Sequence, residues 1–367
     1  MTDTGNFKSN EVNLKKKGLR ASYIILKNIG MYSKPSSSIR IFEKVVEPIL
    51  TYNSEVSLAY FPMTWDLGKF SENMWNIGSE INKVILSFIR QILGVQKKTC
   101  NIAILSETGK YPIAIKVFNA IIKYWLRLHS SEKGLILEAK ALNEDLYMKK
   151  GQNWNRMVDH LLTLTGVSDR PSQNQKTNSK ILNDFKKNTK KLFHKWWQKK
   201  KSEGGKLDFY FTLKNSFGYE NYLDNTPRHI RKSITRIRTS SHNFPIELLR
   251  YSKNKPPREE RKCTICTMNE KGDELHYLLH CTNDSLKEIR EEFMSKLKIQ
   301  IPQFKSFSAG NIIQYCLSMA DHQIQLPMAV YASKILQIYR AERGTTQKMP
   351  VITRYGRLVK KPDKLNL

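Results

Sequence analysis

The sequence has 367 residues, of which 62 are lysine or arginine and 33 are aspartate or glutamate, so its formal net charge is +29. The length suits two or three domains, and the aromatic content argues against a chain that is disordered throughout. The charge favours a polyanionic partner, and we expect nucleic acid, RNA or DNA, because neutralised phosphates release condensed counterions. The alternative is a basic protein that binds polyanions non-specifically, with no biological role for that binding.

The sequence offers no segment that predicts secretion or membrane insertion. Its first residues are polar and unlike a signal peptide, and its longest apolar runs, such as Val84–Ile89, are too short to span a bilayer. Three of the five cysteines fall within nineteen residues, which favours a metal site in a reducing compartment over a disulfide framework. We therefore expect an intracellular protein, nuclear or cytoplasmic, that is not secreted and does not bind a membrane.

The first half of the chain reads as a series of helices. Apolar spacing predicts two between about Glu11 and Leu50, and Pro48 should kink or end the second. Gly30 should stop the first, and Ser36 to Ser38 offer caps for the second. The apolar stripe of the first helix is expected to contain Leu14, Leu19, Tyr23, Leu26 and Ile29. Further helices are predicted over Met74–Leu93 (closing at Gly94), Ile113–Leu128 (buried), Leu135–Leu146 and Asn153–Leu164.

The second half begins with a polar stretch, Ser168 to Lys180, that reads as a linker. The helices expected after it are a very basic one over Ile181–Lys201, then Leu207–Asn215, Arg228–Ile237, Leu286–Leu297 and Met328–Glu342. The tail after Thr345 is basic and expected to be loose. Because β-like runs are few, the predicted fold class is mainly α: a multi-helical basic body with a small Cys₃His zinc knuckle and C-terminal helices.

The chain is expected to divide into five segments. They are a helical segment (1–65), which the resemblance given below makes thumb-like, a helical connector (66–166), a basic helical region (167–255), the zinc knuckle (256–285), and the C-terminal helices with a basic tail (286–367).

The cysteine cluster carries the most specific chemistry in the sequence. Cys263 and Cys266 form a Cys-x₂-Cys pair, nine residues separate Cys266 from His276, and four separate His276 from Cys281. This Cys₃His spacing is close to that of a zinc knuckle, and four protein ligands would leave no open position, so the zinc would be structural. Gly272 and Asp273 favour the tight reversal that the intervening loop requires.

Other interpretations of these residues remain open. The cysteines could be buried and reduced, beside an unrelated histidine. His280 is a rival ligand, although it adjoins Cys281 and adjacent residues rarely reach one tetrahedral centre. Cys100 and Cys316 stand alone in apolar helices and are expected in the core.

The basic helix is the first candidate for nucleic-acid binding. Lysines can follow a phosphate backbone, and aromatic side chains can stack on unpaired bases. The aromatic residues could instead pack in the core, with the lysines solvated or serving as a nuclear localisation signal. The candidate contacts are Lys186, Lys187, Lys190, Lys191 and Lys195, with Lys199, Lys200 and Lys201 beyond them and Phe193, Trp196 and Trp197 between them.

A second basic cluster precedes the cysteines. Together with Arg258 it is expected to form a collar around the zinc site, although ordinary surface charge is the alternative. Its candidate contacts are Arg228, Arg231, Lys232, Arg236, Arg238, Arg261 and Lys262, of which those at positions 228, 231, 232 and 236 can share a helix face. His242 could contact nucleic acid, but we favour a hydrogen-bonded structural histidine.

Several segments, in chain order, are similar to one protein family. Arg261–Cys266 with Asp273–Cys281 resembles the zinc-binding region near the C-terminus of non-LTR (LINE-type) retrotransposon reverse transcriptases. Weaker similarity covers most of the chain, although Leu248–Tyr251 stands where the family usually carries a glycine. The weaker segments are Phe42–Tyr52 (resembling the thumb), Arg90–Val95, Glu107–Pro112 and Lys123–Arg127 (the helical region after the polymerase), and Ile237–Glu247 (just before the knuckle).

The resemblance implies binding of template RNA or target DNA near the knuckle, but not catalysis. A polymerase of this kind needs carboxylates that hold two metal ions, partly as adjacent aspartates on a palm hairpin, and this sequence has no Asp-Asp pair. We expect the C-terminal portion of such a protein: a non-catalytic, zinc-containing nucleic-acid-binding fragment or derivative. The alternatives are part of an active RNA-directed DNA polymerase whose palm lies upstream, and a helical protein-interaction scaffold.

Overall fold

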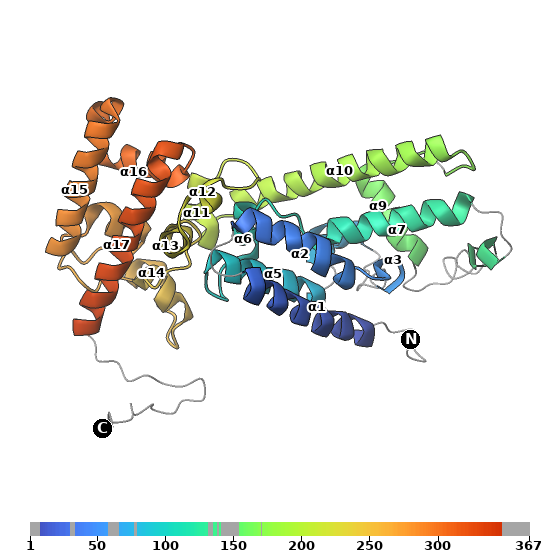
Figure 1. Cartoon of the computed structure of the whole chain (residues 1–367), viewed down its shortest axis with the longest axis horizontal. Coiled ribbons are helices and arrows are strands. Elements are labelled where there is room, and N and C mark those ends of the chain that lie inside the picture. The colour runs from blue at the N-terminus through green and yellow to red at the C-terminus, as the bar shows by residue number, and fades with distance from the viewer. Residues whose placement is uncertain are drawn as a thin grey trace, which may run out of the picture. The chain divides into compact units, whose positions relative to one another are not determined.

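The computed structural model describes residues 8–29, 34–57, 66–76, 79–130, 135–137, 139–140, 154–169 and 171–346. Over these ranges the chain is mainly helical and contains no strand, only two isolated β-bridges, which confirms the predicted fold class. The chain divides into two compact units, which we call unit 1 (Met1–Ser240) and unit 2 (Ser241–Leu367). Figure 1 shows the helices of both, and each unit is described by itself.

Unit 1 is built on long helices joined by short helical turns. Its elements are α1 (Lys8–Ile29), α2 (Pro35–Leu50), α3 (Ser54–Ser57), α4 (Leu67–Asn73), η1 (Met74–Asn76), α5 (Ser79–Leu93), α6 (Asn101–Glu107), α7 (Ile113–Ser130), α9 (Trp154–Thr165), α10 (Gln175–Ser202), η2 (Gly205–Leu207), α11 (Asp208–Leu213), α12 (Tyr222–Asn225) and α13 (Arg228–Arg238).

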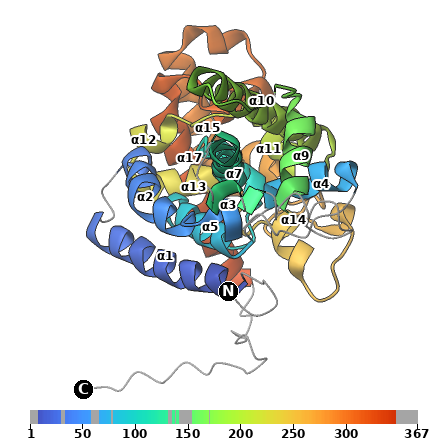
Figure 2. The same cartoon turned by 90° about the vertical axis from the view of Figure 1, so that its right-hand side faces the viewer.

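Helix α7 is the centre of unit 1, because apolar residues occupy most of its circumference. Val117, Phe118 and Ile121 are fully buried, which confirms the burial expected for this helix. In the view of Figure 2, α2, α5, α9 and α10 surround α7. Helices α9 and α10 pack directly against it, so the long basic helix is anchored to the core along one side.

The contact between α1 and α2 differs from the predicted apolar stripe. Leu14 is buried as predicted, but Leu19 and Tyr23 are exposed, and the buried side of α1 continues instead through Gly18, Ser22 and Ile25. A Cβ atom on Gly18 would lie 2.4 Å from the Leu50 side chain, so the absence of a side chain is what lets the two helices approach.

The ends of the helices are set by proline, glycine and capping residues, which the spacing of apolar residues does not reveal. Helix α2 begins at Pro35, a residue suited to a first turn, rather than at a serine cap, and Pro48 stays within its last turn. Gly94, with φ of +68°, directly follows α5 as expected. The predicted linker is wrong over positions 175–180, because Asn174 accepts a hydrogen bond from the Lys176 amide and α10 begins at Gln175; its described residues before Gln175 are non-helical.

Other predictions fall partly or wholly outside the described residues. Gly30, most of the helix predicted over Leu135–Leu146, and the basic tail from position 347 onward lie there. The helices predicted over Asn153–Leu164, Arg228–Ile237, Leu286–Leu297 and Met328–Glu342 are confirmed, with ends shifted by a few residues.

A buried ion pair joins the last residue of α6 to the last residue of α13. The Arg238 guanidinium, fully buried, lies 2.9 Å from a carboxylate oxygen of Glu107, which is also fully buried. The Tyr222 hydroxyl donates to the same carboxylate at 2.7 Å, and Glu220 lies 3.4 Å from the guanidinium. Burial is the largest single effect on the pKa of Arg238 and lowers it, but Glu107, Tyr222 and Glu220 together outweigh burial and raise the pKa.

Unit 2 contains the cysteine cluster and the C-terminal helices. Its elements are α14 (Pro245–Leu248), η3 (Leu249–Tyr251), η4 (Arg258–Glu260), η5 (His276–His280), α15 (Asp284–Gln300), η6 (Pro302–Ser306), α16 (Ala309–Ser318) and α17 (His322–Thr346). The Tyr331 hydroxyl of α17 donates to the Leu278 carbonyl of η5 at 2.6 Å. The knuckle and the C-terminal helices thus share one core, and the predicted segment 167–255 is divided at Ser240.

We predict that Arg238→Met lowers the free energy of unfolding by about 3–5 kcal/mol, because it leaves buried carboxylates without their cation. Arg20→Met, at an exposed position on α1, is the matched control and should change it by less than about 0.5 kcal/mol. Urea denaturation followed by circular dichroism measures both. Equal losses for the two variants would contradict the structural role of the pair.

Candidate metal centre and nucleic-acid-binding surface

The first two cysteines are presented by a short hairpin in unit 2. Lys262 and Lys271 form its antiparallel bridge, and the Cys263 amide donates to the Glu270 carbonyl at 2.8 Å. Gly272 closes the hairpin, because its amide donates to the Arg261 carbonyl and a Cβ atom there would lie 2.8 Å from Pro245. This close approach explains the glycine that the sequence places after the cysteine pair.

The other two members of the cluster come from the helical turn that follows. Asp273 begins the turn, since its carboxylate accepts a hydrogen bond from the His276 amide at 2.9 Å. η5 is a single turn of π-helix, and the Cys281 amide closes it on the His276 carbonyl at 2.7 Å. A π-turn of this length brings His276 and Cys281 back to the same side of the knuckle.

The four side chains converge. One donor atom from each of Cys263, Cys266, His276 and Cys281 lies within 4.8 Å of all the others. The Cys263 and Cys281 sulfurs are 3.9 Å apart, and the Cys266 sulfur is 3.4 Å from Nε2 of His276. These four residues can therefore hold a metal ion, as their spacing predicts, while His280 is exposed and stands outside the group.

The electrostatics of the cluster favour a thiolate. Hydrogen bonding from the Cys281 thiol lowers the pKa of Cys263 to about 3, against the opposing effect of burial. The same hydrogen bond raises the pKa of Cys281 above its usual range, so the two thiols share one proton. Thiolate is the form in which cysteine binds metal ions.

A second layer of side chains orients the ligands. Nδ1 of His276 lies 3.2 Å from a carboxylate oxygen of Glu270, and because a carboxylate only accepts, Nδ1 donates and Nε2 faces the cysteines. Arg290 of α15 donates to the Leu278 and Cys281 carbonyls at 3.2 and 2.9 Å. Neither Glu270 nor Arg290 is marked by a pattern in the sequence, although Glu270 stands only six positions before His276.

His242 supports the knuckle from the preceding segment. It is buried, its Nδ1 accepts from the Phe244 amide at 3.2 Å, and its Nε2 donates to Glu274 at 2.8 Å. Glu274 adjoins the turn that carries His276, so this hydrogen bond fixes the loop between the hairpin and η5. The structural role favoured for His242 from the sequence is therefore confirmed.

The arginines predicted to contact nucleic acid on α13 are partly a structural set. Arg231 and Arg238 are buried, and both have partners in the interior. Arg231 donates to the Leu223 carbonyl at 2.6 Å, and Arg238 pairs with Glu107. The prediction that these two contact nucleic acid is wrong, since neither guanidinium reaches the surface. Arg236 is half-buried and donates to the Gly94 carbonyl at 2.7 Å.

The remaining members of the predicted collar belong to different units. Arg228 and Lys232 are half-buried on α13 in unit 1. In unit 2, Arg261 is buried and donates to the Ile246 and Pro256 carbonyls, while Lys262 is half-buried in the hairpin. The prediction that Arg261 contacts nucleic acid is therefore also wrong, because its guanidinium binds backbone carbonyls. The arrangement of the other residues as a collar around the zinc site stays a prediction.

The lysines of α10 are at the surface, as a nucleic-acid contact requires. Lys186, Lys187, Lys190, Lys191 and Lys195 are all exposed. The ion pairs that α10 makes within the described ranges lie near its ends, at Lys180 with Asp169 and at Lys200 with Glu203. The lysines in the middle of the helix thus form no ion pair with a carboxylate of the described residues.

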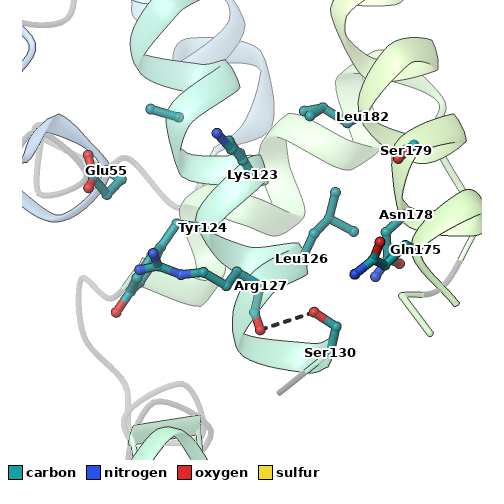
Figure 3. Close-up of a pocket in the computed structure, with 11 residues that line it drawn as sticks. Glu55, Lys123, Tyr124, Leu126, Arg127, Ser130, Gln175, Asn178, Ser179 and Leu182 are labelled. Atoms are coloured by element: carbon teal, nitrogen blue, oxygen red, sulfur yellow. Dashed lines mark hydrogen bonds between the residues drawn. The ribbon is translucent and has the colours of Figure 1, made fainter. Parts of the chain in front are cut away.

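An open groove of about 610 Å³ lies beside the first turns of α10. In Figure 3, Lys123, Tyr124 and Arg127 of α7 form one wall, and Gln175, Asn178 and Ser179 of α10 form the other. The Arg127 guanidinium lies 4.9 Å from the centre of the Tyr124 ring, a cation–π contact. The groove places two further cations next to the basic helix.

None of the described helices is both long and apolar enough to cross a membrane.

Comparisons with known proteins identify no relative. No protein-family model matches the chain, and neither the curated proteins nor the solved structures contain a match.

We predict that Glu270→Gln weakens metal binding by about 10-fold to 100-fold, because the histidine ligand loses its charged hydrogen-bond acceptor. Glu259→Gln is the matched control: the same change of charge in the same knuckle, at a carboxylate that pairs with Lys271 rather than with a ligand. Titration of the metal-free protein with Co²⁺, followed by visible absorption, gives both affinities. An affinity of the Glu270 variant equal to that of the control would exclude the orienting role.

Proposed function

We propose that this chain is a zinc-containing, nucleic-acid-binding protein without catalytic activity of its own. The observation that carries the proposal is the run of exposed lysines on α10 that lack carboxylate partners within the described residues. The net charge of +29 and the Cys₃His cluster of unit 2 support it.

The donor set of the cluster suits zinc. Sulfurs about 2.3 Å from a tetrahedral zinc ion lie roughly 3.8 Å apart, and a sulfur and a histidine nitrogen lie roughly 3.6 Å apart. The corresponding distances here are 3.9 Å and 3.4 Å. Three thiolates and one imidazole would complete the coordination, so zinc here would stabilise the hairpin and η5 rather than activate a substrate.

The exposed lysines suit phosphates better than carboxylates. Each ammonium is a compact, strongly hydrated charge on a flexible stem, which can meet a phosphate without a fixed geometry. Several of them along one helix can neutralise several phosphates and release the counterions that those phosphates had condensed. A protein partner with an acidic surface would offer no such gain on this scale.

The resemblance to LINE-type reverse transcriptases leads to the same proposal. On this interpretation the chain is a derivative or portion of such an enzyme, α13 and the knuckle occupy the region that the family uses near nucleic acid, and the polymerase carboxylates are absent from the chain. The resemblance is strongest at the four ligands, Cys263, Cys266, His276 and Cys281.

We predict one zinc ion per full-length chain and its loss in Cys266→Ser, because three ligands hold the ion far less tightly than four. Cys100→Ser, which alters a cysteine outside the cluster, should retain the metal. Inductively coupled plasma mass spectrometry of the purified proteins measures the content. A folded protein that carries no zinc after purification without chelators would refute the zinc assignment.

We predict that the full chain binds RNA and DNA with strongly salt-dependent affinity. The triple variant Lys187→Gln/Lys191→Gln/Lys195→Gln should reduce the slope of log K against log salt concentration by about 3, one for each lost phosphate contact. Fluorescence anisotropy at several salt concentrations gives these slopes.

The control for this experiment is Lys16→Gln/Lys27→Gln/Lys44→Gln, which removes the same charge from exposed positions on α1 and α2. It should leave the slope nearly unchanged. Absence of binding by the unaltered chain at low salt would refute the proposed function, and equal effects of the two triple variants would remove α10 from it.

A further inference from the structure

The exposed lysines of α10 form a row on the side opposite the core. Phe185, Thr189, Phe193 and Trp197 are buried at intervals of four residues, and Lys187, Lys191, Lys195 and Lys199 follow the same interval two positions later. Two residues correspond to about 200° around a helix, so the lysines project away from unit 1. With about 1.5 Å of rise per residue, this lysine row is roughly 18 Å long.

The aromatic side chains of α10 face the core, contrary to the stacking role considered from the sequence. Trp197 is buried, and its ring nitrogen donates to the Ser106 hydroxyl at 2.6 Å. Phe193 is buried among Trp75, Tyr111 and Phe217. Trp196 is half-buried on one flank, with the Lys200 ammonium 6.0 Å from its ring centre. Among the described residues of α10, no exposed aromatic side chain stands beside the lysine row on which a base could stack.

In its middle turns this side exposes a single kind of group, and the exposed amides Asn183 and Gln198 lie beyond those turns. Every exposed side chain between positions 186 and 195 is a lysine. Readers of base pairs combine arginine, asparagine, glutamine or carboxylate groups, because each base pair presents its own pattern of donors and acceptors. A surface of one charge type can instead contact phosphates whatever the sequence between them.

We propose that α10 binds the sugar–phosphate backbone of double-stranded nucleic acid without reading its bases. This inference rests on the proposed function and names the partner class of its lysine row. A duplex offers one charge per about 1.7 Å of its axis, a higher density than a single strand provides. Proteins that prefer single strands add stacking on aromatic side chains, whereas Phe185, Phe193 and Trp197 of α10 are buried and Trp196 is half-buried.

Duplex RNA and duplex DNA present the same chemistry to this surface, so the experiment includes both. The full chain is titrated, by fluorescence anisotropy at one low and one moderate salt concentration, with 20-base-pair duplexes of two unrelated sequences, as RNA and as DNA. Single strands of the same length form the third set of probes, with normal bases and with every base removed. The lysine-row triple variant, Lys187→Gln/Lys191→Gln/Lys195→Gln, is measured on all of them.

We expect duplexes to bind more tightly than single strands, equal affinity for the two sequences, and equal affinity for single strands with and without bases. Base reading would cost about fivefold or more in affinity for each changed base pair, and stacking would make the base-free strand the weaker ligand. Either result, or a preference for single strands, would overturn the inference while leaving nucleic-acid binding intact. Weak binding of every probe at low salt would instead refute the proposed function itself.

Discussion

The structure depends on where a chain with a net charge of +29 places its cations. Most must stay apart from one another at the surface, and the few that are buried must be paired. An unpaired buried charge costs several kcal/mol, so each buried cation needs a carboxylate or backbone carbonyls beside it. Arg238 has Glu107, Lys110 has Glu47, and Lys214 has Glu220. These carboxylates neutralise the buried cations. The remaining lysines and arginines lie on surfaces such as the outer side of α10.

Much of the architecture can be predicted from the sequence because local rules decide it. Amphipathic spacing identifies most of the long helices, and the ligand spacing from Cys263 to Cys281 identifies the cluster, since its four residues lie on one hairpin and one turn. Interactions between residues that are close in sequence produce a spacing of residue types that can be recognised before the fold is known.

The remaining features require tertiary contacts that spacing does not contain. Arg238 resembles a surface arginine until Glu107, more than one hundred residues earlier, is placed beside it. Leu19 and Tyr23 fit a helical stripe, but Gly18 brings α1 against Leu50 on another side. Glu270 orients His276 only after the hairpin has brought it back toward η5. A charged or small residue therefore carries little information about its position when its partner is distant in sequence.

Helix α10 has its buried residues and its exposed lysines on separate sides. Phe185, Phe193 and Trp197 pack into unit 1, and the lysine row, two positions later along the helix, faces solvent. Substitutions in one row can therefore accumulate during evolution without disturbing the other. Under the proposed function, selection could change the affinity of this helix for nucleic acid one lysine at a time, with little effect on the stability of the fold.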